Sequence, residues 1–316
     1  PEFPKINVAR YTLGLTYHRK GDFEKAQQAL DAIPQAERGG DLNLTSYLLA
    51  DCALRLTPAE APLDDALAVG KMEESLKNAA THLEAFTAGP INPQTGDALL
   101  KLGLVQQRLA GLLNQPAEKA KVLATARATY ERLFAKEFTG QPAVPQAVLE
   151  RAKVIGQTDV GQAINELRKF QNDPLKQSAT APIALVQLAT YLRGQNKAGE
   201  AADVLAKARA EHEDKLQKDP ERQPWVAILR YHHGVALREA GKLAEARNAF
   251  DSVVKQFPGR VEAAESALRF GQCLKEEGER ELDMSVKLRS GAKKAEDFAT
   301  ATKLEADGYK NLRDSV

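Results

Sequence analysis

Apolar residues recur along much of the chain at intervals of three and four positions, which is the spacing of one face of an α-helix. The segment from Tyr231 to Pro258 shows this pattern most clearly. Its small and apolar residues lie at fixed distances from one another, at Gly234, Leu237, Gly241, Leu243, Ala246 and Phe250. The spacing predicts a helix with a small residue where it crosses its neighbour, a turn at Gly241, and a second helix that ends before Pro258.

The same arrangement occurs in three other places. The copy near the N-terminus contains Leu13, Gly14, Tyr17, Gly21, Phe23, Ala26, Leu30 and Pro34. Another contains Leu188, Ala189, Leu192, Ala198, Ala201, Leu205 and Ala208, and a further copy begins at Phe270, Gly271, Leu274 and Gly278. In this last copy Gly278 takes the place of the turn residue Gly241. Because each copy predicts one pair of helices, we expect an all-α chain of about seven stacked hairpins.

These residues resemble the tetratricopeptide repeat, a helix-turn-helix unit of about 34 residues with a small residue in each helix and a proline at its end. The match is good over residues 7–40, 182–212 and 227–260. The resemblance implies a right-handed α-solenoid of stacked helix-turn-helix repeats. It also implies a non-enzymatic scaffold that binds a segment of a partner protein in the concave groove of the superhelix.

Two hairpins in the first half of the chain are expected to be longer than the others. Ala50 and Ala79 match the two small positions but lie 29 residues apart, where the segment with Gly234 and Ala246 has 12. We therefore expect a repeat array over residues 4–278, with insertions near 57–75 and 110–120 that form loops or extended helices.

The two ends of the sequence carry separate expectations. Pro1, Glu2 and Phe3 resemble the remnant of a cloning site, so residues 1–3 are excluded from the fold. Residues 279–316 are expected to form helices that cap the last repeat, contact a partner or fill the groove. Capping is favoured because a terminal repeat has to cover its outer apolar face.

Composition and charge restrict the partners. Residues that favour helices dominate, and only 6% of the residues are aromatic. With 44 basic and 43 acidic residues the formal net charge is +1, so no global field attracts nucleic acid, and we expect no nucleic-acid partner. No apolar stretch is long enough to cross a membrane, so we expect membrane contact only through regions outside this sequence.

Candidate catalytic and metal-binding residues are few. His232 and His233 are adjacent, so on a helix they point about 100° apart and cannot hold one metal ion together. His233 precedes Gly234 as Leu13, Leu188 and Phe270 precede the small residues of the other copies, which predicts a core position. Cys52 and Cys273 form no metal spacing and are expected to be buried. Because phosphate-loop and hydrolase motifs are also missing, we expect no catalysis, no cofactor, no metal and no small-molecule substrate.

The first helices of successive repeats are expected to line the groove. Four residues after the small position the copies carry His18, Gln107, Arg193, Arg238 and Lys275. These cations either complement the helix dipoles or form a basic stripe for an acidic peptide or its C-terminal carboxylate. Tyr11 and Tyr231 would add stacking surface. Chaperone-binding repeats place Lys and Asn where this chain has Tyr11 and Leu15, which argues against recognition of chaperone tails.

One other function is compatible with the whole sequence. The chain is alternatively a regulatory or targeting module of a larger enzyme or membrane-associated protein. Residues 250–279 resemble the junction between repeats in bacterial cell-envelope assembly proteins. That resemblance favours the cell envelope or periplasm over the cytoplasm.

Overall fold

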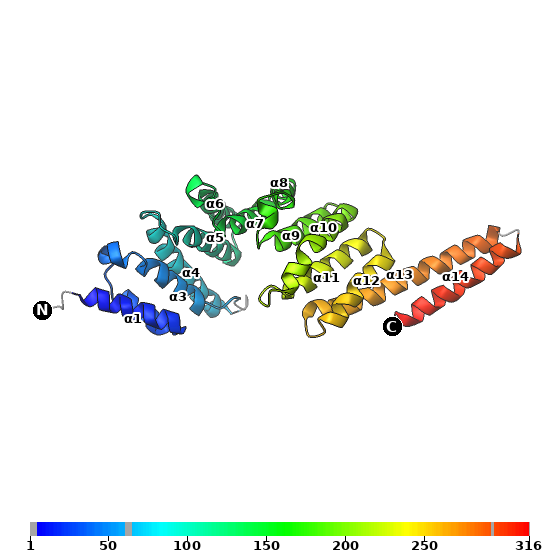
Figure 1. Cartoon of the computed structure of the whole chain (residues 1–316), viewed down its shortest axis with the longest axis horizontal. Coiled ribbons are helices and arrows are strands. Elements are labelled where there is room, and N and C mark those ends of the chain that lie inside the picture. Colours follow the sequence, from blue (N-terminus) through cyan, green and yellow to red (C-terminus); the bar gives the residue numbers. More distant parts are fainter. Residues whose placement is uncertain (1–4, 61–64, 292–293, 316) are drawn as a thin grey trace. The chain divides into compact units, whose positions relative to one another are not determined.

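The computed structural model describes residues 5–60, 65–291 and 294–315, and Figure 1 shows their helices in chain order. The described residues form fourteen α-helices and five short 3-10 helices, and they contain no strand. By the contacts among its Cα atoms the chain divides into two compact units, residues 1–163 and residues 164–316. The structure confirms the predicted all-α fold of stacked helices.

Unit 1 contains three helical hairpins and one additional helix. Its helices are α1 (Ile6–Lys20), α2 (Phe23–Asp31), α3 (Thr45–Leu56), α4 (Ala66–Thr87), α5 (Thr95–Leu112), α6 (Pro116–Arg132) and α7 (Ala143–Gly156). Short 3-10 helices lie at Gln35–Glu37, Gly40–Leu42 and Lys136–Phe138. The hairpins are α1 with α2, α3 with α4, and α5 with α6, and α7 packs against both α5 and α6.

Unit 2 also contains three hairpins. The helix α8 (Val160–Leu167) spans the boundary between the units, and two 3-10 helices follow it at Arg168–Gln171 and Leu175–Gln177. The remaining helices are α9 (Ala181–Gly194), α10 (Ala198–Gln217), α11 (Pro224–Glu239), α12 (Leu243–Gln256), α13 (Val261–Gly291) and α14 (Ala295–Asp314). The hairpins are α9 with α10, α11 with α12, and α13 with α14.

Small residues stand where the two helices of a hairpin cross, as the spacing predicts. A Cβ atom added to Gly14 would lie 2.5 Å from Cγ of Leu30, and one added to Gly103 would lie 2.2 Å from Cε1 of Tyr130. Both Leu30 and Tyr130 are fully buried. The missing side chain therefore allows a large residue of the second helix to pack directly on the backbone of the first.

Glycine in a left-handed conformation forms two of the predicted turns. Gly21 ends α1 with φ of 78°, and Gly241 follows α11 with φ of 77°. Between α9 and α10 the same conformation falls on Asn196, with φ of 58°, and asparagine tolerates it better than most residues do. These residues reverse the chain between the two helices of each hairpin.

The extra residues of the long hairpins lie mostly in helices. α4 already begins at Ala66, so much of the expected insertion near 57–75 extends this helix to 22 residues. α5 ends at Leu112 and α6 begins at Pro116, so the stretch near 110–120 is helical except for a short linker. Residues 1–3, the expected cloning remnant, and residues 61–64 lie outside the described residues.

The expected turn at Gly278 is wrong. α13 continues as one helix past the expected domain boundary after residue 278, because the residues that follow favour helix and include no breaker. Gly278 is needed for another reason, since a Cβ atom there would lie 2.7 Å from the backbone oxygen of Gly308 in α14. α13 and α14 consequently lie side by side along their length (Figure 1).

None of the described helices combines sufficient length with sufficient apolar character to cross a membrane.

Candidate partner-binding faces

The first helices of neighbouring hairpins are linked to each other within each unit. α1 contacts α3 in unit 1, and α11 contacts both α9 and α13 in unit 2. We call the surface formed by α1, α3 and α5 the unit 1 face, and the surface formed by α9, α11 and α13 the unit 2 face. The sequence predicts the partner-binding residues on these faces.

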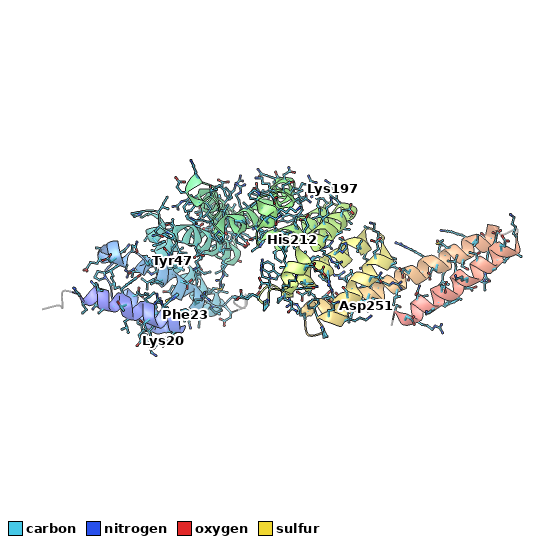
Figure 2. The ribbon with its side chains drawn as sticks, in the orientation of Figure 1. Lys20, Phe23, Tyr47, Lys197, His212 and Asp251 are labelled. Atoms are coloured by element: carbon cyan, nitrogen blue, oxygen red, sulfur yellow. The ribbon has the colours of Figure 1, made fainter. Side chains whose placement is uncertain are left out.

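A polar network joins the three helices of the unit 1 face. Nε2 of His18 lies 2.8 Å from Oδ2 of Asp51, and Nζ of Lys101 lies 2.7 Å from the other oxygen of Asp51. Lys101 also lies 2.9 Å from Oδ2 of Asp97 and donates a hydrogen bond of 2.9 Å to the hydroxyl of Tyr47. Tyr47, which Figure 2 labels on α3, donates in turn to Asp97 at 2.7 Å. The network therefore connects α1 to α3 and α3 to α5.

Arg55 of α3 balances the charges of this network, because it lies 3.6 Å from Asp51 and gives two cations, Lys101 and Arg55, for the two carboxylates Asp51 and Asp97. Burial raises the pKa of Asp51. The hydrogen bond and charge of Lys101 and the hydrogen bond with His18 lower it by more than burial raises it, so the pKa falls below its usual value. Burial lowers the pKa of Lys101, while its hydrogen bonds to Asp51, Tyr47 and Asp97 raise it more, and the net direction is upward. Lys101 is therefore held as a cation by these partners.

Ion pairs also join the helices of the unit 2 face. Arg193 of α9 binds both carboxylate oxygens of Glu239 in α11, at 2.6 and 2.5 Å. Arg238 of α11 donates two hydrogen bonds to Glu276 of α13, one of them 3.0 Å long. Each acid lies directly after the predicted cation of its own helix: Glu239 follows Arg238, and Glu276 follows Lys275. Arg193 and Arg238 thus hold neighbouring first helices together.

The other predicted face residues have less uniform surroundings. Tyr11 and Leu15 are partly buried and pack against the cluster that contains Leu30. Gln107 donates a hydrogen bond of 2.6 Å to the hydroxyl of Tyr130. Tyr231 accepts one of 3.1 Å from Arg269 of α13. Lys275 is exposed and lies 3.8 Å from Glu279 of its own helix.

An open apolar depression of about 480 Å³ lies between α3 and α5 on the unit 1 face. Its lining consists of Leu54, Lys101, Leu104, Val105, Gln107 and Arg108. Val105 is buried, whereas Leu54 and Leu104 are half-buried and reach solvent. This part of the face offers an apolar floor with polar groups at its rim.

Comparison with known families decides the type of repeat in unit 2. Residues 229–260 match the sequence profile described as tetratricopeptide repeat. Residues 229–260 form a tetratricopeptide repeat. The match confirms the repeat that the spacing of Gly234, Gly241 and Ala246 predicts.

Solved structures are similar in fold to this chain over nearly its whole length. One is a signal transduction ATPase with numerous domains that contains a tetratricopeptide repeat sensor, from Pyrococcus horikoshii. It is 12% identical with a TM-score of 0.55, and the match covers 98% of this chain and 43% of that one. Another is the assembly chaperone of RpL4, 16% identical with a TM-score of 0.50, with 90% of this chain and 99% of that one covered. This chain therefore spans less than half of the ATPase. Comparison with curated proteins finds no match.

The paired histidines lie within the tetratricopeptide repeat. Nδ1 of His233 lies 3.0 Å from Arg209 of α10, and burial lowers the pKa of both His232 and His233 to about 4. His233 is only half-buried. The position before the small residue, which the sequence predicts to be in the core, is not buried in every copy. Leu13 in the first hairpin is 49% exposed. α1 is the first helix of the array, and no earlier described hairpin covers this side chain.

The described residues contain no group of three or more histidine, cysteine or acidic side chains arranged to hold a metal ion. Cys52 and Cys273 are free and buried, as the sequence predicts. Burial raises the pKa of Cys52 to about 12 and that of Cys273 to about 11, so both stay protonated at neutral pH.

Sequence reasoning missed the position five residues after the small residue in each first helix. In unit 1 this position holds Arg19, Arg55 and Arg108. In unit 2 the corresponding residues are Gly194, Glu239 and Glu276. The signal was present in the sequence, one position beyond the cations that the repeat frame singled out.

Proposed function

We propose that this protein is a non-enzymatic scaffold that binds a segment of a partner protein on its first-helix faces. The fold supports this proposal, since helical repeats present long, preformed surfaces on rigid elements. A preformed surface loses little conformational entropy on binding, so a modest number of contacts suffices for useful affinity.

The observation that carries the proposal is the apolar depression between α3 and α5. Leu54 and Leu104 line it and remain partly exposed to solvent. Contact of these leucines with water does not stabilise the fold, and grouped exposed apolar side chains are typical of a binding site. An apolar side chain of a partner would bury both leucines. Polar groups at the rim, Lys101 and Arg108 among them, would orient the partner's backbone and charges.

The proposed partner-contacting residues remain those predicted from the sequence, each considered within its own unit. On the unit 1 face they are Tyr11, Leu15, His18 and Gln107. On the unit 2 face they are Arg193, Tyr231, Arg238 and Lys275. The ion pairs of Arg193 and Arg238 mean that a partner on the unit 2 face contacts matched pairs and not isolated cations.

A second candidate function is a regulatory or sensor module of a larger protein. The similarity to the ATPase that contains a tetratricopeptide repeat sensor favours it, because this chain matches 43% of that protein. An enzymatic or membrane-associated segment in the complete gene would support this alternative. A location in the bacterial cell envelope rests on residues 250–279 alone and stays a prediction.

A selection from a random peptide library displayed on phage tests the main proposal. The wild-type chain and a Leu104→Glu variant are used as separate baits, after circular dichroism has shown equal helicity. Leu104→Glu places a charge on the floor of the depression. Peptides enriched by the wild type and not by the variant support the proposal, whereas no enrichment, or equal enrichment by both baits, contradicts it.

A further inference from the structure

Three arginines occupy the same repeat position on three successive first helices of unit 1. Arg19, Arg55 and Arg108 each follow the small residue of their helix by five positions. Arg19 and Arg55 are exposed, and Arg108 is half-buried at the rim of the apolar depression. Equivalent positions of stacked repeats align, so we call these three residues the arginine row.

Two of the three positive charges of the arginine row have no acidic partner among the described residues. Neither Arg19 nor Arg108 has a carboxylate within ion-pair distance there. Arg108 donates only to the backbone oxygens of Pro58 and Ala59, at 2.5 and 3.3 Å. Arg55 is paired, since it lies 3.6 Å from Asp51 and its guanidinium lies 5.7 Å from the ring centroid of Phe23. In the described part of the chain, the unmatched charge of the row is therefore that of Arg19 and Arg108.

The unit 2 face has no corresponding row of arginines. There the same position holds Gly194, Glu239 and Glu276, and the two glutamates neutralise Arg193 and Arg238. A negatively charged partner is therefore expected to bind more tightly to the unit 1 face than to the unit 2 face.

We propose that the unit 1 face binds an acidic segment of a partner protein, with carboxylates on the arginine row and an apolar side chain in the depression between α3 and α5. This inference rests on the proposed function and specifies its partner. Arginine suits this role because its planar guanidinium binds a carboxylate through two parallel hydrogen bonds.

The geometry of stacked helices sets the spacing of the acidic residues. Packed helices lie about 10 Å apart, and an extended chain advances about 3.3 Å per residue. Carboxylates three or four residues apart in an extended segment therefore reach successive arginines. The depression lies between the helices of Arg55 and Arg108, so the apolar residue falls between the second and third carboxylates.

Arg19 and Arg55 lie in the last turns of α1 and α3, where a cation also stabilises the helix through its dipole. This role alone predicts a change in stability without a change in binding. Single-stranded nucleic acid is a rival ligand for the row. The near-zero net charge of the chain favours the peptide, since phosphate binding relies on an extended basic surface.

Fluorescence anisotropy with synthetic peptides tests the inference. The probe carries aspartate at every third position and one leucine between the second and third aspartates. Its two controls replace the leucine with serine, or every aspartate with lysine. We compare the wild-type chain with the Arg19→Glu/Arg55→Glu double variant and with Lys121→Glu, which replaces an exposed lysine of α6, a helix outside the unit 1 face. Thermal unfolding confirms that all three proteins are folded.

The inference predicts that the acidic probe binds the wild type and Lys121→Glu equally, and that the double variant binds it about ten-fold more weakly. The serine probe binds more weakly than the leucine probe, and added salt weakens both. Equal binding by the double variant and the wild type, no binding of the acidic probe, or tighter binding of a single-stranded oligonucleotide overturns it.

The proposed function and this inference fail separately. If the phage selection yields peptides that depend on Leu104 but carry no acidic residues, the scaffold proposal stands and the acidic partner is wrong. If no peptide depends on Leu104, the scaffold proposal itself is wrong.

Discussion

A Cβ atom on Gly234 would lie 2.7 Å from Cε1 of Phe250, so the ring of Phe250 packs directly on the backbone of α11. Phe250 is fully buried in α12. Gly103 and Tyr130 have the same relationship in unit 1, where the Cβ atom would lie 2.2 Å from the ring. These glycines set how closely the two helices of a hairpin approach each other.

Gly234→Leu tests this close packing. The new side chain would overlap Phe250 and push α11 and α12 apart, so we expect a loss of about 2 kcal/mol in the free energy of unfolding. Gly70→Ala in α4 is the matched control, because a Cβ atom there meets nothing within 4 Å. We expect it to gain about 0.8 kcal/mol from helix propensity. Equal urea midpoints for Gly234→Leu and the wild type would show that the repeat interpretation is wrong.

Asp51→Asn tests the network that joins α1, α3 and α5. The substitution removes the charge that His18 and Lys101 share, and we expect a loss of about 2 kcal/mol at pH 7. The pKa of Asp51 in the folded protein lies below its usual value of 3.8. Its contribution is therefore complete above pH 3.8 and disappears as the pH falls through the lower folded value.

Unfolding measured by circular dichroism in urea at a series of pH values checks this prediction. The difference in stability between the wild type and Asp51→Asn should shrink in acid. A difference that stays constant down to the acid unfolding of the protein would rule out the ionised network.

His232 and His233 should make the protein less stable in mild acid. Burial lowers their pKa from 6.5 to about 4 in the folded state. The unfolded chain therefore binds protons between these values while the folded chain does not, so stability is lost as the pH falls from 6.5 toward 4. In a His232→Phe variant the difference in urea midpoint between pH 7 and pH 5 should be smaller than in the wild type. An unchanged difference would contradict the assigned pKa.

Gly308→Leu tests the contact between α13 and α14. A Cβ atom at this position would lie 2.9 Å from Cγ of Leu282 and 3.0 Å from the backbone oxygen of Gly278. We expect α14 to detach at least in part, with faster hydrogen exchange over residues 295–314 and little change in α1 to α6. Gly291→Ala, where a Cβ atom meets nothing, is the control. Unchanged exchange in Gly308→Leu would show that the close contact is not required.

The fold could be predicted from the sequence because its determinants are local. Small residues such as Gly14 and Gly234, left-handed glycines such as Gly21 and Gly241, and the spacing of apolar residues indicate the hairpins directly. The prediction of a turn at Gly278 was wrong, because a single sequence does not distinguish a glycine that ends a helix from a glycine that allows a neighbouring backbone to approach. Only the position of Gly308 on α14 distinguishes them.

The candidate site was harder to predict, because it depends on which residues meet across hairpins. Nothing near Arg193 in the sequence shows that Glu239 neutralises it 46 residues later. Among the described residues, the unpaired charge lies instead on Arg19 and Arg108, one position beyond the predicted residues His18 and Gln107. Likewise the depression exists because Leu54 and Leu104 come together from different hairpins.

Hydrogen exchange with mass spectrometry on the complex with a selected peptide tests the central claim most directly. If a partner segment binds the unit 1 face, exchange slows in residues 45–56 and 95–112, the helices α3 and α5 that line the depression. The Leu104→Glu variant shows no such slowing. Slower exchange confined to α13 and α14, or no change anywhere in the presence of the peptide, would contradict the account.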